Sequence, residues 1–332
     1  MAQQLPVKIA GLGWYLPERR VTSAELGARL NVTPVLIERA TGVIERRYAG
    51  GETSAEMGAA AVRMALEHAG IELGAVDAFI GASTAPQQCI PCTAAFVQRE
   101  LGAPEGRSVC FDINATCMSF LVALQTAAHL IAAGTYRRVV IFSSEIASIS
   151  LNPAEWESAA LFGDAAAAAV LTLSEGGEAS AIWPSKFATY SSGVDLTRCA
   201  GGGTLHHPNH PDTTREMNMF SMQGPAIFRQ ALRLMRPFVD DFFNTLGWER
   251  SEVARVVPHQ ASRHAIEQLS GRLEFRQDQV FTNLPFRGNC VAASIPLALA
   301  EAVHAGRIRR DDRVLLIGTG AGLTLGAVAL TF

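Results

Sequence analysis

Short apolar runs alternate with longer segments of helical periodicity along this chain. Brief apolar runs bounded by polar or turn residues predict buried strands, and they occur at residues 7–11, 78–82 and 139–143. Longer stretches predict helices at residues 54–69, with Ser54 as the N-cap, and at residues 93–101. This alternation predicts an α/β architecture in which helices cover buried sheets.

The order of these segments is repeated in the two halves of the chain. Three segments have loose counterparts further on: residues 77–84, 138–145 and 163–171 are echoed, in the same order, by 254–261, 313–320 and 320–330. Such a repeat predicts a duplicated α/β unit. We place the join near residues 174–181, which divides the chain into an N-terminal half, residues 1–176, and a C-terminal half, residues 177–332.

Composition indicates a globular protein with a large core. The 332 residues are 48% hydrophobic and 18% charged, with a formal net charge of −3, which favours extensive burial and argues against nucleic-acid binding. The best apolar run, residues 165–173, is too short to cross a membrane, and the first residues lack the apolar core of a signal peptide. Six cysteines are too sparse for a disulfide framework, so we expect reduced thiols in a cytoplasmic protein.

Cys117 is the candidate nucleophile, because it lies where a strand passes into an apolar helix. A short apolar strand at residues 109–113 and a polar turn at 114–116 precede it, and an almost uninterrupted apolar helix, residues 118–133, follows. A helix that is apolar on every side is buried, and the N–H groups at its N-terminus favour a thiolate. We therefore expect a lowered pKa for Cys117 and faster alkylation than at the other five cysteines, which fit the commoner role of inert core residues.

Two polar residues of the second half are candidates to complete a site around this thiol. His259 follows an apolar strand at residues 256–258, and Asn289 lies in a Gly-containing turn before a predicted helix at residues 292–303. A nucleophile needs a base and an oxyanion site. Cys, His and Asn far apart in the sequence are the arrangement expected when the fold, not a local loop, assembles the site.

With these residues the chain resembles condensing enzymes of thiolase fold, specifically the β-ketoacyl-(acyl carrier protein) synthase III type. Matching motifs include Asp-Ile-Asn-Ala-Thr-Cys at residues 112–117, Pro-His-Gln-Ala-Ser at 258–262 and Gly-Asn-Cys at 288–290. Further matches lie at residues 11–18, 40–47, 161–168 and 318–322, so the likeness spans nearly the whole chain in family order. The resemblance implies two duplicated halves stacked as five layers, α-β-α-β-α, and a homodimer.

The resemblance also implies a reaction. Cys117 accepts an acyl group from a thioester, and backbone N–H groups stabilise the oxyanion. Those groups belong to Cys117 itself and to a loop of Gly320, Ala321 and Gly322. His259 and Asn289 then stabilise the enolate of a malonyl- or β-ketoacyl-thioester, which attacks the acyl group in a Claisen condensation. The expected substrates are acyl thioesters of acyl carrier protein or coenzyme A, and no metal or redox cofactor is needed.

Departures from the family pattern concern the substrate. Leu36 and Trp156 occupy the positions of the Trp and Arg that sandwich the adenine of coenzyme A in housekeeping members. We therefore expect donors bound to a carrier protein. Ile90 replaces the aromatic residue that closes the acyl pocket across the dimer, which implies a longer acyl tunnel and a medium or long acyl chain. Ser262 replaces the usual Asn after the histidine, which changes the hydrogen-bonding reach at that position.

Several alternatives remain open at this point. Relatives that join two long acyl chains use a Glu from the partner subunit as base, but residues 82–97 contain no Asp or Glu. Relatives in quinolone and α-pyrone pathways keep the triad and change both substrates. A plain acyltransferase, which moves the acyl group to an alcohol or amine, has less use for Asn289. A non-catalytic partner subunit is disfavoured by the presence of Cys117.

Other motifs in the chain favour structural roles. Cys89-x-x-Cys92 has no second ligand pair at zinc spacing. The histidines at residues 206–210 lie in a Gly-, Pro- and Asn-rich stretch that predicts an exposed loop. Gly-x-Gly-x-Gly at residues 318–322 lacks the βαβ unit of a dinucleotide site, and its glycines instead suit a loop whose backbone approaches the cysteine. Asp164 is expected to hold loops together.

Overall fold

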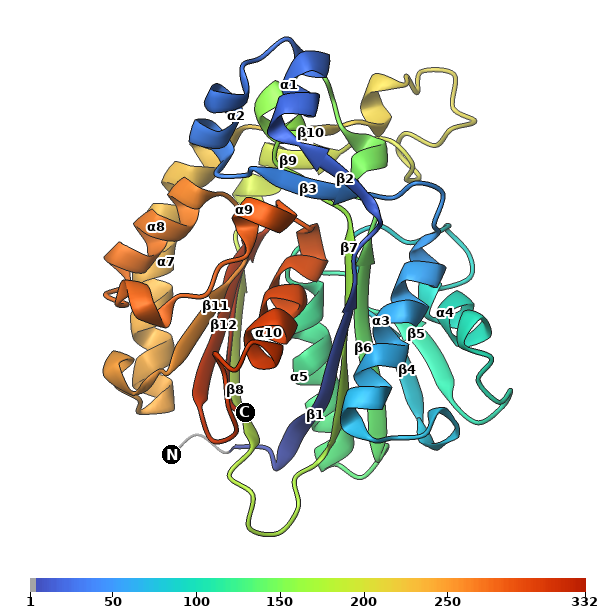
Figure 1. Cartoon of the computed structure of the whole chain (residues 1–332), viewed down its shortest axis with the longest axis vertical. Coiled ribbons are helices and arrows are strands. Elements are labelled where there is room, and N and C mark those ends of the chain that lie inside the picture. Colours follow the sequence, from blue (N-terminus) through green and yellow to red (C-terminus); the bar gives the residue numbers. More distant parts are fainter. Residues whose placement is uncertain (1–3) are drawn as a thin grey trace.

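Two β-sheets stand with helices between them and on their outer faces (Figure 1). The structure is a computed structural model and describes residues 4–332. The first sheet has the strand order β1 (Val7–Tyr15), β7 (Ala165–Leu173), β6 (Arg138–Glu145), β4 (Ala78–Gly81), β5 (Val109–Asp112). The second has the order β11 (Arg255–Pro258), β12 (Arg313–Gly320), β13 (Thr324–Thr331), β8 (Ala181–Thr189). The strands predicted at residues 7–11, 78–82 and 139–143 are confirmed as β1, β4 and β6.

The two sheets share one pattern of strand directions. In the first, β1 and β7 pair antiparallel, β7 and β6 antiparallel, and β6 and β4 parallel. In the second, β8 and β13 pair antiparallel, β13 and β12 antiparallel, and β12 and β11 parallel. The repeated sequence segments therefore occupy equivalent strands. The proposed division after residue 176 falls in the connection between β7 and β8, and the duplication itself stays a prediction.

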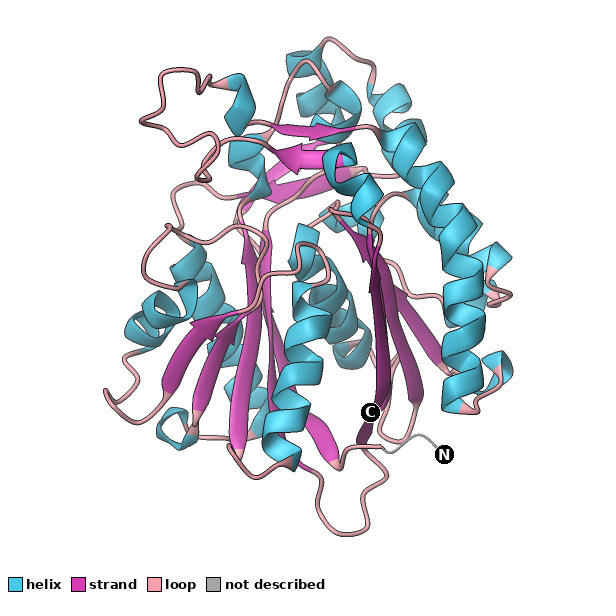
Figure 2. Cartoon of the chain, turned by 180° about the vertical axis from the view of Figure 1, so that it is seen from behind, coloured by secondary structure: helices cyan, strands magenta, loops and turns pink. Residues whose placement is uncertain are grey.

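Helices fill the space between the sheets and cover both outer faces, which makes five layers (Figures 1 and 2). The middle layer holds α5 (Ser119–Ala132) and α10 (Ser294–His304). The first sheet is covered by α3 (Ser54–Ala69) and α4 (Thr93–Leu101), and the second by α7 (Gly224–Leu246) and α8 (Arg263–Arg272). The two predicted helices are confirmed as α3 and α4, but the N-cap of α3 is Thr53, which forms a capping box with Glu56.

The largest core cluster lies in the middle layer and draws on both sheets. It includes Phe120 and Leu124 of α5, Leu299 of α10, Ile141 of the first sheet and Leu316 of the second. Because both sides of α5 face a sheet, its side chains are apolar almost all round, and the prediction that this helix is buried is confirmed. The central helices thus bind the two halves into one core.

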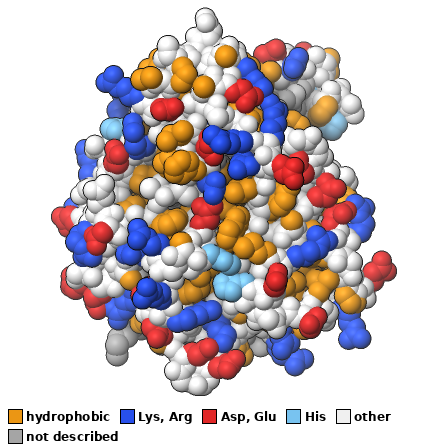
Figure 3. All heavy atoms as spheres, viewed as in Figure 1, with side chains coloured by type: hydrophobic (Ala, Val, Ile, Leu, Met, Phe, Trp, Pro, Cys, Tyr) orange, Lys and Arg blue, Asp and Glu red, His pale blue; other side chains and the backbone are white. Residues whose placement is uncertain are grey.

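Shorter elements gather at one end of the sheets, above the middle helices in Figure 1, and we call them the capping region. They are α1 (Ser23–Leu30), α2 (Pro34–Thr41), α6 (Trp156–Ala159), α9 (Leu284–Arg287), β2 (Arg19–Thr22), β3 (Glu45–Tyr48), β9 (Thr197–Cys199) and β10 (Phe220–Met222). Short 3-10 helices complete the connections at Leu73–Ala75, Ala147–Ser150, Ser191–Leu196, Glu216–Asn218, Arg250–Glu252, Gln277–Gln279 and Val291–Ala293. Within residues 4–332, none of the helices is both long and apolar enough to span a membrane. On the face shown in Figure 3, Lys and Arg side chains are interspersed with Asp and Glu.

Candidate active site

Cys117 lies in a tight turn between β5 and α5. The preceding residue, Thr116, has a left-handed backbone with φ of 52°. The Ser119 hydroxyl fixes this turn, because it accepts a hydrogen bond from the Ala115 N–H (2.9 Å) and donates one to the Thr116 carbonyl (2.6 Å). The helix begins at Ser119, two residues after the thiol. The turn therefore holds Cys117 just before the helix and not inside its first turn.

The side chain of Cys117 is a protonated thiol, and not a thiolate, at neutral pH. Burial raises its pKa to about 12, and the carboxylate of Glu145 acts in the same direction, against N–H groups of Ala321 and Cys117 that lower it. The expected lowering of the pKa is therefore wrong. The reason is that the N–H groups of Met118 and Ser119 already donate to the carbonyls of Ala115 and Thr116, so they cannot compensate for the lost hydration of a thiolate.

His259 follows β11 and is held by the backbone of the neighbouring strand. Its N–H donates to the Ile317 carbonyl of β12 at 2.8 Å. Burial lowers the pKa of the imidazole to about 4, so the ring is neutral at physiological pH. Among residues 4–332 its Nδ1 has no hydrogen-bond partner. The next residue, Gln260, is fully buried and accepts hydrogen bonds from Thr282 and Asn283, which anchors the turn behind the histidine.

Asn289 has an amide whose orientation is set by its neighbours. Its Oδ1 accepts from the Val291 N–H (2.9 Å) and the Ser294 hydroxyl (3.3 Å). The carbonyl side of the amide is thus occupied, and the NH₂ group remains as a donor toward the cavity. Gly288, with φ of 69°, lets the chain reach this position, because a Cβ there would lie 2.7 Å from the Leu161 carbonyl.

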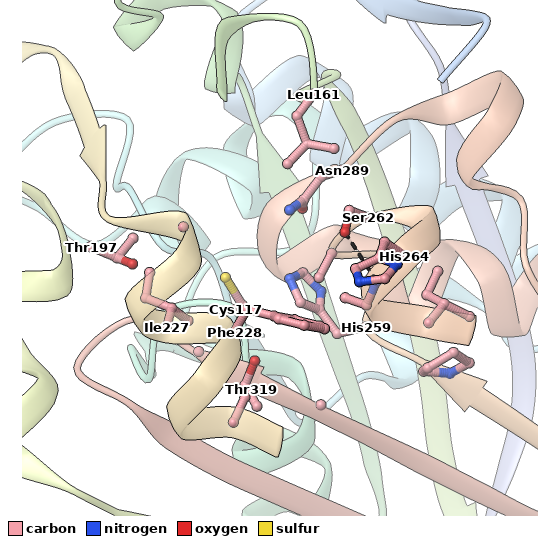
Figure 4. A pocket seen from close by; sticks show the side chains of 18 of the residues that line it. Cys117, Leu161, Thr197, Ile227, Phe228, His259, Ser262, His264, Asn289 and Thr319 are labelled. Atoms are coloured by element: carbon pink, nitrogen blue, oxygen red, sulfur yellow. Dashed lines mark hydrogen bonds between the residues drawn. The ribbon is translucent and has the colours of Figure 1, made fainter. Parts of the chain in front are cut away.

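The three predicted residues line a single cavity of about 530 Å³ (Figure 4). Cys117, His259 and Asn289 come from three separate elements, and the close-up shows their side chains directed into the same space. The cavity wall also includes Gly320 and Ala321 at the end of β12. The N–H of Ala321 lies close enough to the Cys117 sulfur to lower its pKa. The loop that contains Gly320, Ala321 and Gly322 therefore brings a backbone donor to the thiol, while Gly322 itself is absent from the cavity wall.

Glu145 is a residue near the site that sequence reasoning missed. It ends β6, is buried, and accepts a hydrogen bond from the N–H of Thr84. Burial raises its pKa to about 7, against N–H groups of Thr84 and Ala292 that lower it. The sequence contains one signal for it, a glutamate that ends a strand with an apolar centre, because an ionisable residue is rarely buried without a partner.

The four residues that depart from the family pattern lie at different places in the structure. Ile90 is 82% exposed and is not part of the wall of the cavity that holds Cys117, so its role in an acyl tunnel stays a prediction. Leu36 is 46% exposed on α2. Trp156 packs against an apolar cluster of the capping region. The Ser262 hydroxyl accepts from the Ala265 N–H at 3.2 Å, at the start of α8 (Figure 4).

The remaining motifs have structural roles. The carboxylate of Asp164 accepts hydrogen bonds from Ala49 and Ser148, which confirms that it holds loops together. Residues 206–210 form an irregular segment, and His207 and His210 in it are exposed. Within residues 4–332 no three His, Cys, Asp or Glu side chains are grouped so that they could hold a metal ion.

The fold and the site define a condensing enzyme of thiolase-like fold. Two family models match: the 3-oxoacyl-[acyl-carrier-protein] synthase III model over residues 111–191, which include Cys117, and its C-terminal model over residues 243–332, which include His259 and Asn289. The chain is 36% identical over 98% of its length to β-ketoacyl-[acyl-carrier-protein] synthase III 3 of Streptomyces coelicolor, of which it covers 96%.

Solved structures agree with this match. The 3-oxoacyl-[acyl-carrier-protein] synthase III of Aquifex aeolicus superimposes with a TM-score of 0.89 at 33% identity, over 98% of this chain and 100% of that one. A priming β-ketosynthase of a polyketide pathway superimposes with a TM-score of 0.90 at 29% identity, over 99% and 97%. The chain belongs to the β-ketoacyl-[acyl-carrier-protein] synthase III family. It is an acyltransferase that forms a carbon–carbon bond by Claisen condensation.

Proposed function

We propose that Cys117 carries the acyl group and that His259 and Asn289 serve the condensation of that group with a second thioester. The convergence of these three side chains on one apolar cavity supports the assignment. In the first step the sulfur of Cys117 attacks the thioester carbonyl, and the N–H groups of Ala321 and Cys117 stabilise the oxyanion. The carbon–sulfur bond of the donor breaks, and the proton of Cys117 leaves with the released thiol.

In the second step the thioester carbonyl of the other substrate accepts hydrogen bonds from His259 and the NH₂ group of Asn289. A neutral imidazole suits this role, because it offers an N–H without placing a positive charge in the cavity. The second thioester becomes an enolate by losing CO₂ if it is a malonyl thioester, or an α-proton if it is a β-ketoacyl thioester. The enolate attacks the acyl carbon, and the bond from that carbon to the Cys117 sulfur breaks. The Cys117 sulfur takes up that α-proton, or a proton from water after loss of CO₂, and the product is a β-keto compound with one new carbon–carbon bond.

We further propose that acyl donors arrive on a carrier protein and that the working unit is a homodimer. Two features of the capping region argue against the stacking of the adenine of coenzyme A on a side chain there. Leu36 has no ring, and the Trp156 ring packs against a cluster that includes Ile37 and Tyr48. The name of the family and of its relatives points to the same carrier. Ile90 is exposed in the single chain, and a second copy of the chain would cover it in the dimer. Sedimentation of the purified protein would show whether it is a dimer.

Intact-protein mass spectrometry tests the assignment of the three residues. Wild-type protein and the Cys89→Ala control should gain the mass of an acyl group from an octanoyl-carrier donor, and Cys117→Ala should gain none. His259→Ala and Asn289→Ala should still be acylated but should condense at a rate lower by roughly 10²- to 10³-fold, the cost of one lost oxyanion donor. If these two variants lose acylation and keep the condensation of preformed acyl-enzyme, the roles are assigned wrongly.

A further inference from the structure

Glu145 is a buried carboxylate that receives backbone N–H groups from both halves of the chain. It ends β6 and is 3% exposed. The carboxylate accepts the N–H of Thr84, and the N–H groups of Ala85 and Ala292 also stabilise its charged form. Thr84 and Ala85 follow β4 in the first half, whereas Ala292 precedes α10 in the second half. This one side chain therefore connects two segments that are far apart in the sequence.

In the second half, Glu145 supports the segment that carries Asn289. Ala292 lies in the 3-10 helix Val291–Ala293, three residues after Asn289. The Val291 N–H donates to the Asn289 Oδ1 at 2.9 Å, so the backbone of this short helix orients the amide. Val291 itself has a left-handed backbone with φ of 51°, which is unfavourable for a β-branched residue and persists only where neighbours enforce it. The bond from the next N–H to the carboxylate is such a restraint.

In the first half, the same carboxylate is linked to the turn that carries Cys117. Thr84 donates its N–H to Glu145, and its carbonyl accepts a hydrogen bond of 2.8 Å from the Asn114 side chain. The Asn114 Oδ1 accepts the N–H of Thr116, next to Cys117, at 2.9 Å. The carboxylate thus reaches this turn only through two intermediate residues, and hydrogen bonds inside the turn hold it as well.

We propose that Glu145 is a positioning residue for the condensation step, because its charge holds the segment of Ala292 and thereby the amide of Asn289. An ionised carboxylate accepts N–H groups more strongly than a neutral acid does. The same charge opposes a thiolate at Cys117, so it gives no help to the first step. The inference rests on the proposed condensation at Cys117, and it adds a residue that serves the second half-reaction and not the first.

The pH range from 5.5 to 8 is where the charge of Glu145 changes, since its pKa is about 7. Cys117 and Cys290 also feel this charge, but burial raises the pKa of both thiols, and Cys117 has no proton once it is acylated. His259, with a pKa of about 4, stays neutral over the range. Asp164 lies beside the β7 residue that pairs with Glu145. It is still present in Glu145→Gln, so a comparison with this variant isolates the contribution of Glu145.

Glu145→Gln tests the inference on the two half-reactions separately. Protein first acylated on Cys117 by an octanoyl-carrier donor is supplied with a malonyl- or 3-oxooctanoyl-carrier. At pH 8 the wild type should condense faster than Glu145→Gln by about tenfold or more, since a small misplacement can cost up to about 10²-fold. The ratio of the two rates should fall toward one at pH 5.5. Acylation of Glu145→Gln at pH 8 should be at least as fast as that of the wild type. Glu105→Gln, at an exposed loop residue, is the matched control and should follow the wild type in both steps.

Two further variants show whether Glu145 acts through Asn289. In an Asn289→Ala background, Glu145→Gln should change the condensation rate by less than about twofold, because both changes remove the same interaction. Glu145→Asp keeps the charge, and it should restore part of the pH dependence that Glu145→Gln has lost. Full additivity of the two changes would contradict a role through the amide.

Hydrogen exchange tests the restraint without any reaction. In unacylated protein, residues 288–294 should exchange faster in Glu145→Gln than in the wild type at pH 8, even if Cys117 accepted no acyl group and the proposed function failed. The same peptide should be unchanged in Glu105→Gln. The proposal is overturned if this segment exchanges at the wild-type rate in Glu145→Gln. It is also overturned if Glu145→Gln condenses like the wild type at pH 8 or slows acylation as much as condensation.

Discussion

Burial sets the charge of the two groups closest to the proposed chemistry. The same loss of hydration raises the pKa of Cys117 to about 12 and lowers that of His259 to about 4. A thiol and a neutral imidazole are therefore the resting pair at pH 7, and not a thiolate with an imidazolium. In the proposed acylation the thiol therefore loses its proton during the attack on the thioester, and the released thiol carries that proton away.

This resting state predicts a steep pH dependence for alkylation of Cys117. Only the thiolate reacts, and below a raised pKa its fraction increases about tenfold per pH unit. Iodoacetamide should therefore modify the exposed Cys89 first at pH 7, and the rate at Cys117 should keep rising through pH 9. Peptide mapping by mass spectrometry measures both rates. A plateau at Cys117 by pH 8 would contradict the raised pKa.

Glu145 should account for part of this dependence. Its own pKa is about 7, so its negative charge opposes thiolate formation above neutral pH and is absent well below it. Glu145→Gln should thus speed alkylation of Cys117 at pH 9 and leave the rate at pH 5.5 unchanged. Glu105→Gln, a change at an exposed loop residue, is the control and should have no effect at either pH.

At the scale of elements, the end of β12 must pass very close to the turn that carries the thiol. A Cβ on Gly320 would lie 2.6 Å from the Thr116 hydroxyl, and one on Gly318 would lie 2.6 Å from the His259 Cβ. Glycine is needed at both positions because side-chain atoms of neighbouring residues already occupy the space that a Cβ would take. The close approach is what brings the Ala321 N–H to the sulfur.

Gly320→Ala should therefore impair acylation by moving this loop away from Cys117. Loss of one hydrogen-bond donor from the oxyanion site costs roughly 10²- to 10³-fold in rate. The acylation rates of wild type and variant are compared by stopping their reactions with the same acyl thioester at set times. Gly176→Ala, where an added Cβ meets nothing within 4 Å, should acylate at the wild-type rate. Equal rates for Gly320→Ala and wild type would show that the Ala321 N–H is not part of the oxyanion site.

At the scale of the whole molecule, the capping region is where a donor and its carrier would meet the enzyme. Leu36→Trp should give coenzyme A thioesters a ring on which adenine stacks, an interaction worth roughly 1–3 kcal/mol. The KM for octanoyl-coenzyme A should fall about fivefold or more, while the KM for the carrier-bound donor should not fall. Val35→Trp, at the neighbouring position, which is 75% exposed, is the control. If wild type already uses coenzyme A thioesters as well as carrier-bound ones, the preference for a carrier is wrong.

Local sequence patterns were sufficient for several of the central elements and for naming the three candidate residues. Apolar runs at residues 78–82 and 139–143 became β4 and β6, because short-range periodicity reports which side of a segment is buried. The repeated order of segments matched the equivalent strands of the two sheets. Cys117, His259 and Asn289 stood out through motifs, and the fold brings them to one cavity.

Only the tertiary structure decided the properties that depend on residues far apart in the chain. The pKa of Cys117 is raised because packing removes water and brings Glu145 near it, and no local pattern contains that neighbour. Likewise the cavity that holds Cys117 exists only because residues of β11, α7 and the turn before α5 line the same space. The sequence by itself indicated which segments are buried and which residues are candidates for the chemistry. The loss of hydration at each group, the electric field and the cavity shape arise from contacts that form only when the two halves pack together.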